Sequence, residues 1–144
     1  MRRRGYTLIE VLAALAIVTA MMTVGLFLGS RFVTRHNEQA YFRRVQSEWR
    51  SLQTRAEVTP QPIAIDFNGG SREILLTSGT TPVQRLPLPK SLSLLSTSRL
   101  AQNPGKQFAT PRVIYVHSRL GYEYRLAFEM GWGKLIVTRV DLGD

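Results

Sequence analysis

The sequence predicts an α+β fold in which one long N-terminal helix packs on a small antiparallel sheet. An apolar segment near the N-terminus is followed directly by residues whose apolar positions repeat at helical spacing. No proline precedes Pro60 to interrupt this helix. The last third contains three short β-forming segments separated by glycine-containing turns, a pattern typical of an antiparallel meander.

The apolar segment extends from Tyr6 to Gly29 and contains one charged residue, Glu10. About 20 apolar residues are enough to cross a bilayer as a helix. Arginines occupy positions 2–4 before the segment, and Arg31 and Arg35 follow it. Because arginines beside the first span tend to stay in the cytoplasm, we expect a single-pass protein of the cell membrane. Its N-terminus is expected in the cytoplasm and its C-terminal domain outside.

The helix is expected to continue beyond the membrane segment. Apolar residues recur at intervals of 3, 4, 3 and 4, which places them on one face of a helix: Phe42, Val45, Trp49, Leu52 and Ala56. Arginines and other polar residues occupy the remaining positions. The apolar face has to be buried against the domain that follows, so Trp49 is interpreted as a core residue.

Pro60 and Pro62 end this helix. Ile63–Phe67 alternates as a strand does, and a hairpin turn at residues 68–70 leads into Arg72–Leu76. Three prolines predict an irregular segment next, then a short strand at 92–95 and a loop at 101–111. The last strands are expected at 112–117, 122–128 and 134–140. The predicted organisation is a basic leader at 1–5, a transmembrane helix at 6–30, its amphipathic continuation at 31–58 and a small antiparallel β domain at 59–144.

Composition excludes several kinds of chemistry. The chain has no cysteine, so it can form neither disulfides nor thiolate metal sites. His36 and His117 are predicted on different elements without a carboxylate at ligand spacing, and we expect no metal and no cofactor. Asp141 and Asp144 are interpreted as a solvated tail rather than a calcium site. Without a nucleophile–base arrangement, the chain is not expected to be an enzyme.

Glu10 requires an explanation, because a carboxylate at the centre of a membrane helix costs about 2.5–3.5 kcal/mol on insertion scales. It lies one turn into the segment, so its side chain could reach back to the lipid headgroups. Alternatively, its partner is a positive charge on another chain.

The residues from Arg4 to Leu12, Arg-Gly followed by Tyr-Thr-Leu-Ile-Glu-Val-Leu, resemble the processing motif of type IV prepilins and pseudopilins. The resemblance implies that a membrane peptidase cuts after Gly5 and methylates the new N-terminus at Tyr6, where the family usually has phenylalanine. It also implies that Glu10 assists subunit assembly. The implied partners are the prepilin peptidase/methyltransferase, other pilin or pseudopilin subunits, membrane lipid and, indirectly, an assembly ATPase and a polytopic membrane platform.

A finer resemblance concerns Tyr124–Lys134, which reads YRLAFEMGWGK. This segment is similar to minor pseudopilins of Gram-positive competence systems, the ComGD-like branch in particular. We therefore expect a minor pilin or pseudopilin of a type IV-like competence pilus, which takes up DNA for transformation. A minor pseudopilin of type II secretion or a minor type IV pilin is the alternative, and an uncleaved membrane-anchored accessory protein is another.

The net charge of +9 makes direct contact with DNA a further hypothesis. Basic residues of the last third are interleaved with aromatic residues, which can hold a nucleic-acid strand by charge and stacking. The candidate contacts are Arg112, Arg119, Arg125, Lys134 and Arg139, near Tyr115, Tyr122, Tyr124 and Trp132. The competing interpretation is a basic solvent face over an aromatic core.

Overall fold

A computed structural model describes residues 7–103, 111–129 and 133–141, without the side chains of residues 27 and 28. The chain divides into two compact units, Met1–His36 and Asn37–Asp144. One helix, α1, extends from Leu8 to Val58 and contributes to both units. The expected long helix is therefore present.

In the first unit, α1 carries the apolar segment, and nearly all of its described side chains are exposed. The helix is long and apolar enough there to cross a membrane. Its threonine hydroxyls donate hydrogen bonds to carbonyl groups one turn earlier, Thr19 to Leu15 and Thr23 to Thr19. These polar groups are thus satisfied within the helix itself, as a lipid environment requires.

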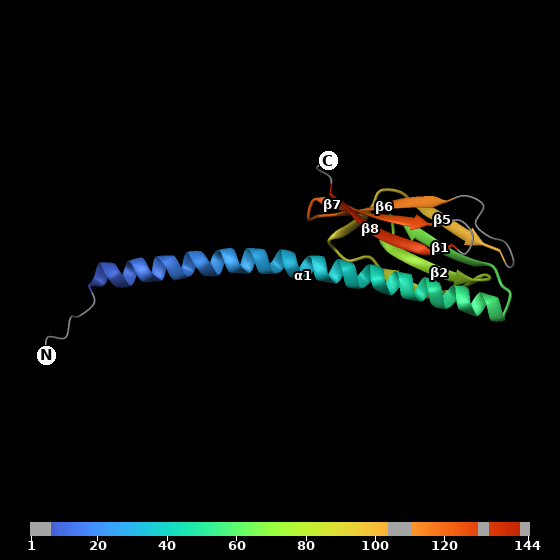
Figure 1. Ribbon diagram of the computed structural model, residues 1–144, viewed down its shortest axis with the longest axis horizontal. Coiled ribbons are helices and arrows are strands. Elements are labelled where there is room, and N and C mark those ends of the chain that lie inside the picture. Colours follow the sequence, from blue (N-terminus) through green and yellow to red (C-terminus); the bar gives the residue numbers. More distant parts are fainter. Residues whose placement is uncertain (1–6, 104–110, 130–132, 142–144) are drawn as a thin grey trace. The chain divides into compact units, whose positions relative to one another are not determined.

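The second unit contains two antiparallel four-stranded sheets (Figure 1). The first sheet has the order β3-β2-β1-β5 and the second has the order β4-β6-β7-β8. The strand bounds are β1 Ile63–Asn68, β2 Glu73–Ser78, β3 Thr81–Pro87, β4 Leu92–Leu94, β5 Ser98–Gln102, β6 Arg112–Ser118, β7 Tyr122–Phe128 and β8 Leu135–Asp141.

Both sheets and one face of α1 share a single core. Trp49 is 1% exposed, packs edge-to-face on Phe128 of β7 at 5.9 Å, and donates its indole N–H to the Gly133 carbonyl at 2.9 Å. Phe128 in turn lies 6.1 Å from Phe67 of β1, which connects the two sheets. The predicted apolar face of the helix is therefore buried, and Trp49 is a core residue.

The sequence prediction was wrong about two segments before residue 103. The proline-containing segment expected to be irregular forms β3, and the start of the expected loop belongs to β5. β3 is an edge strand, where a proline need not donate a ladder hydrogen bond. The domain therefore has two sheets, because these two strands complete the first one. Residues 104–110 of the expected loop lie outside the described part of the chain.

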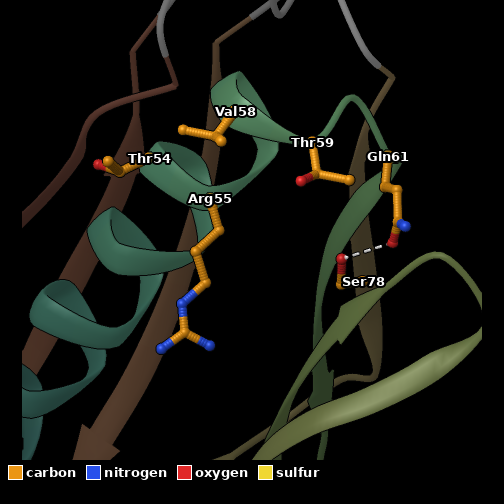
Figure 2. A pocket seen from close by; sticks show the side chains of 6 residues that line it. All are labelled: Thr54, Arg55, Val58, Thr59, Gln61 and Ser78. Atoms are coloured by element: carbon orange, nitrogen blue, oxygen red, sulfur yellow. Dashed lines mark hydrogen bonds between the residues drawn. The ribbon is translucent and has the colours of Figure 1, made fainter.

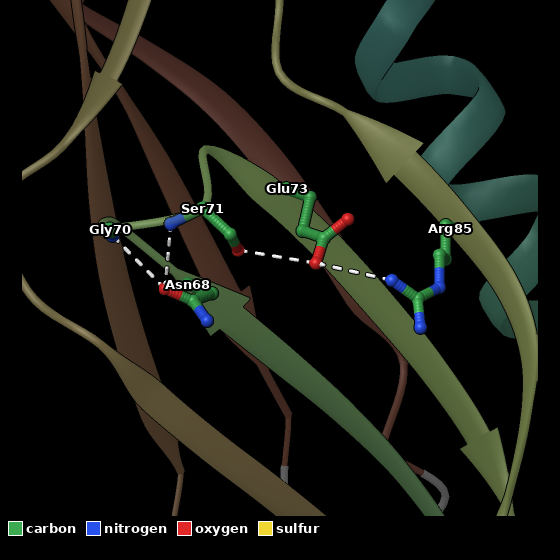
Figure 3. A network of polar contacts seen from close by, with 5 residues as sticks. All are labelled: Asn68, Gly70, Ser71, Glu73 and Arg85. Carbon is green, nitrogen blue, oxygen red and sulfur yellow. Dashed lines mark hydrogen bonds and ion pairs between the residues drawn. The ribbon is translucent and has the colours of Figure 1, made fainter.

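The turn between β1 and β2 is held by a short polar network (Figure 3). The Asn68 side-chain oxygen accepts the backbone N–H groups of Gly70 and Ser71 at 3.0 and 3.1 Å. Ser71 donates to Glu73, which lies 3.8 Å from the Arg85 guanidinium of β3. An asparagine that bonds its own following backbone is typical of a turn, so this predicted hairpin is confirmed.

Candidate functional site: the helix start and a buried carboxylate

The first described turn of α1 carries the residue predicted to act in assembly. The Thr7 carbonyl accepts the N–H groups of Glu10 and Val11 at 3.0 and 3.2 Å, so the helix begins directly after Thr7. The residues Thr7 to Glu10 have the spacing of a capping box, and a carboxylate is favourable beside the positive end of the helix dipole. Glu10 is exposed among exposed apolar residues. Gly5 and Tyr6 lie outside the described residues.

A second carboxyl group, Glu38, is completely buried at 0% exposure. Ser118 donates to its two oxygens at 2.9 and 3.0 Å, and Tyr122 donates to Oε2 at 2.8 Å. The Tyr124 hydroxyl lies 3.4 Å from the same oxygen. All three partners are hydroxyl groups that are placed to donate hydrogen bonds to the Glu38 side chain.

The Glu38 cluster, formed by Glu38, Ser118, Tyr122 and Tyr124, joins α1 to the hairpin between β6 and β7. Burial, reinforced by the neighbouring carboxyl group, raises the pKa of Tyr124 above its ordinary value. Burial also raises the pKa of Tyr122. The Arg139 guanidinium carbon lies 5.2 Å from the centre of the Tyr122 ring, on the core side of β8. The cluster is a polar link within the core, without the geometry of a nucleophile and its base.

Burial of Glu38 was not predicted, although the sequence contains a signal for it. Continuing the apolar stripe from Phe42 back by four residues reaches position 38, so the helical period alone places Glu38 on the buried face. Because Glu38 and its neighbours in the sequence are polar, position 38 was not recognised as part of the buried face. Its hydroxyl partners are 80 or more positions away in the chain, so their proximity requires the fold.

The five candidate DNA contacts are distributed over different parts of the second sheet. Arg125 lies in the middle of β7 and is exposed on the outer face, whereas Arg139 of β8 contacts Tyr122 on the core side and pairs with Asp141 at 3.0 Å. The others are exposed at strand ends: Arg112 begins β6, Arg119 follows β6 and Lys134 precedes β8. The structure therefore does not gather these five side chains on one surface.

The aromatic residues near these basic residues differ in accessibility. Tyr122 and Tyr124 are 7% and 4% exposed, so their rings are not available to stack on bases. Tyr115 is 48% exposed, and Trp132 lies outside the described residues. Direct DNA binding by this surface stays a prediction, with one exposed tyrosine to support it.

His117 has a carboxylate partner that its spacing in the sequence did not predict. Its Nδ1 lies 2.7 Å from Glu123 Oε1, because the two residues are cross-strand partners on β6 and β7. The two residues are six positions apart in the sequence, and only the register of the β6–β7 hairpin shows that they lie opposite each other. Within the described ranges, no three His, Asp or Glu residues come together as metal ligands would.

An open groove of about 380 Å³ lies beside the C-terminal end of α1 (Figure 2). Its lining comprises Thr54, Arg55, Val58, Thr59, Gln61 and Ser78. The Ser78 hydroxyl donates to the Gln61 side-chain oxygen at 3.2 Å. This lining contains no carboxylate, histidine or thiol that could act as a general base, so the groove offers no catalytic arrangement.

These features define an α+β protein of pilin-like arrangement, with an apolar helix of membrane-spanning length. Residues 1–26 match the family described as the prokaryotic N-terminal methylation motif. The match covers about a fifth of the chain, and it supports a type IV pilin-like or pseudopilin-like structural subunit that a prepilin peptidase processes. Searches of the curated proteins and of the solved structures found no match to the chain.

Proposed function

We propose that this protein is a minor pilin or pseudopilin that is cleaved after Gly5, methylated at Tyr6 and assembled into a type IV-like competence pilus for DNA uptake. The observation that carries the proposal is the methylation-motif match at residues 1–26, together with a carboxylate in the first turn of an exposed apolar helix. A structural role in a filament accounts for both features.

The proposed role of Glu10 follows from electrostatics. Cleavage after Gly5 creates a positively charged amino group at Tyr6, and methylation keeps its charge. In a medium of low dielectric constant, opposite charges attract much more strongly than in water. A carboxylate on one subunit and the amino terminus of its neighbour would therefore compensate each other. Exposed side chains such as Leu8, Ile9 and Leu12 leave this part of the helix free to pack against other subunits.

Intact mass spectrometry tests the processing step. The full chain is expressed with and without a prepilin peptidase. We expect the peptidase to remove residues 1–5 and to add one methyl group to the mature chain. A Gly5→Leu variant should keep its leader in both strains and serves as the control. If the unaltered chain keeps its leader in the presence of active peptidase, an uncleaved signal anchor replaces this proposal.

The choice of a competence pilus rests on the segment Tyr124–Lys134, which is similar to minor pseudopilins of Gram-positive competence systems. Deleting the gene should abolish transformation by added DNA, and restoring it should recover transformation. Loss of protein secretion with normal transformation would instead assign the subunit to a type II secretion system. Loss of surface filaments alone would assign it to type IV pili.

A tip subunit that touches DNA directly is the second candidate. Its support is the positive net charge and the exposed pair Tyr115 and Arg125, which face each other on β6 and β7. Gel shifts with single- and double-stranded DNA, over a salt series, test it with the fragment that begins at Arg31. Because phosphate contacts are strongest at low salt, absence of a shift there excludes direct binding by this fragment.

A further inference from the structure

The outer face of the second sheet carries an exposed patch with apolar margins and one arginine. We define the Arg125 patch as Val113 and Tyr115 of β6, Arg125 and Ala127 of β7, and Ile136 of β8. The strand register places Val113, Ala127 and Ile136 in one row across the sheet, beside a row that contains Tyr115 and Arg125. Val113 is 38% exposed and Tyr115 is 48% exposed, so the patch is accessible to a partner.

Arg125 has no acidic partner within the described residues. Glu123, two residues earlier on the same face, is held by His117 at 2.7 Å and is only 15% exposed. The residues directly across from Arg125 are Tyr115 and Thr138, and neither is acidic. Three other arginines on the two sheets do lie beside an acid: Arg85 beside Glu73, Arg99 beside Asp66 and Arg139 beside Asp141.

The composition of the patch suits a protein better than a nucleic acid. Tyrosine and arginine are enriched among residues that contribute most to protein interfaces, and apolar neighbours help to exclude water around them. A nucleic acid would instead require several cations along one line, because each phosphate contact contributes only a part of the affinity. The residues directly across from Arg125 on both sides, Tyr115 and Thr138, are not cations.

We propose that the Arg125 patch docks another protein, whose contacting surface is apolar and places a carboxylate opposite the Arg125 guanidinium. The patch covers parts of three strands, which lie about 4.8 Å apart, so it is smaller than the roughly 800 Å² per partner of a stable interface. The contact is therefore one of at least two between the proteins. Shared membrane anchoring, which rests on the proposed function, would supply the second through a high effective concentration.

Photo-crosslinking of the full chain in cells tests this inference. Benzoylphenylalanine replaces Tyr115 in one variant and Val83 of β3 in the control, since Val83 is similarly exposed at 42% on the other sheet. We expect a protein adduct at position 115 that resists nuclease and is absent at position 83. Mass spectrometry of the adduct then identifies the partner and the carboxylates near the crosslink.

Charge reversal decides whether Arg125 is the recognition element. Arg125→Glu should reduce the adduct at least about tenfold, because like charges in an interface cost several kcal/mol. Arg50→Glu makes the same charge change on the exposed side of α1 and should leave the adduct unchanged. Replacing the partner's carboxylate by arginine should restore the adduct with Arg125→Glu.

Four results would overturn the inference. They are an adduct no stronger at position 115 than at position 83, an adduct destroyed by nuclease, an undiminished adduct in Arg125→Glu, or no restoration by any partner carboxylate near the crosslink. If circular dichroism shows that Arg125→Glu is unfolded, Arg125→Gln takes its place, and an undiminished adduct in that variant likewise overturns the inference. Intact mass of the same samples reports leader removal separately, so failure of this docking contact is distinguishable from failure of the proposed processing.

Discussion

The Glu38 cluster allows one substitution to be compared at two neighbouring sites. Tyr122 and Tyr124 are both buried on the core side of β7, and their rings pack edge-to-face at a centroid distance of 5.5 Å. Their hydroxyls differ in distance to the same Glu38 oxygen, 2.8 Å for Tyr122 and 3.4 Å for Tyr124. Replacing either tyrosine by phenylalanine removes only the hydroxyl and keeps the ring.

The two distances predict different losses of stability. Removing one partner of a buried hydrogen bond costs about 1–3 kcal/mol, because the other partner is left unsatisfied. The Tyr122 bond lies within the usual O–H···O range of about 2.5–3.0 Å, whereas the Tyr124 distance lies beyond it. We therefore expect Tyr122→Phe to lower the free energy of unfolding by about 1–3 kcal/mol. Tyr124→Phe, which loses the longer 3.4 Å contact with the same oxygen, should cost less than about 1 kcal/mol.

Urea unfolding of the fragment that begins at Arg31, followed by tryptophan fluorescence, measures both variants. Trp49 lies in the core and should report the loss of packing. The free energy of unfolding should fall with urea concentration at the same slope in the variants and in the unaltered fragment. A difference in the midpoint then reports a difference in stability alone. Ser71→Ala, at an exposed turn hydroxyl, controls for the loss of a hydroxyl as such. Equal losses in the two tyrosine variants, or a larger loss for Tyr124→Phe, would refute the reasoning.

Three further predictions concern other parts of the chain. Glu10→Ala should still insert into the membrane but enter filaments poorly, which fractionation and pilus purification would show; normal incorporation would exclude an assembly role. Gly121→Ala, at a φ of +91°, should lose about 1–2 kcal/mol in urea unfolding, whereas Gly70→Ala, whose Cβ would meet only the Asn68 side chain, should lose less. Burial raises the pKa of Tyr41 and Tyr124 above their ordinary value of 10.0. The two hydroxyls lose their protons at a lower pH in the unfolded chain than in the folded one. Their contribution to the free energy of unfolding is therefore complete below pH 10 and is lost as the pH rises through the raised pKa values. Urea unfolding at increasing pH measures this loss, and a midpoint that stays independent of pH until alkaline unfolding would contradict it.

Local patterns were sufficient for the helix and most strands. The absence of proline before Pro60 and the 3–4 spacing from Phe42 to Leu52 predicted one helix with one buried face, because helical geometry relates residues only three or four positions apart. Alternation predicted β1, β6, β7 and β8 in the same way. The edge strand β3 was missed because proline is rare in strands other than at an edge, a strand start or a bulge, and only the sheet order shows that β3 is an edge strand.

The candidate sites also separate into those that depend on local sequence and those that depend on tertiary structure. By itself, the sequence determined the N-terminal methylation motif, the apolar span and the position of Glu10 within it, since each depends on consecutive residues. Only the tertiary structure decided that Glu38 is buried among Ser118, Tyr122 and Tyr124 and that His117 has Glu123 as its partner. It also placed Arg125 on an exposed sheet face, where no acid in the described part of the chain pairs with it. Hydrogen bonds and ion pairs depend on distances of a few ångströms between side chains, and residues 80 positions apart reach such distances only when strand register and helix packing are both established.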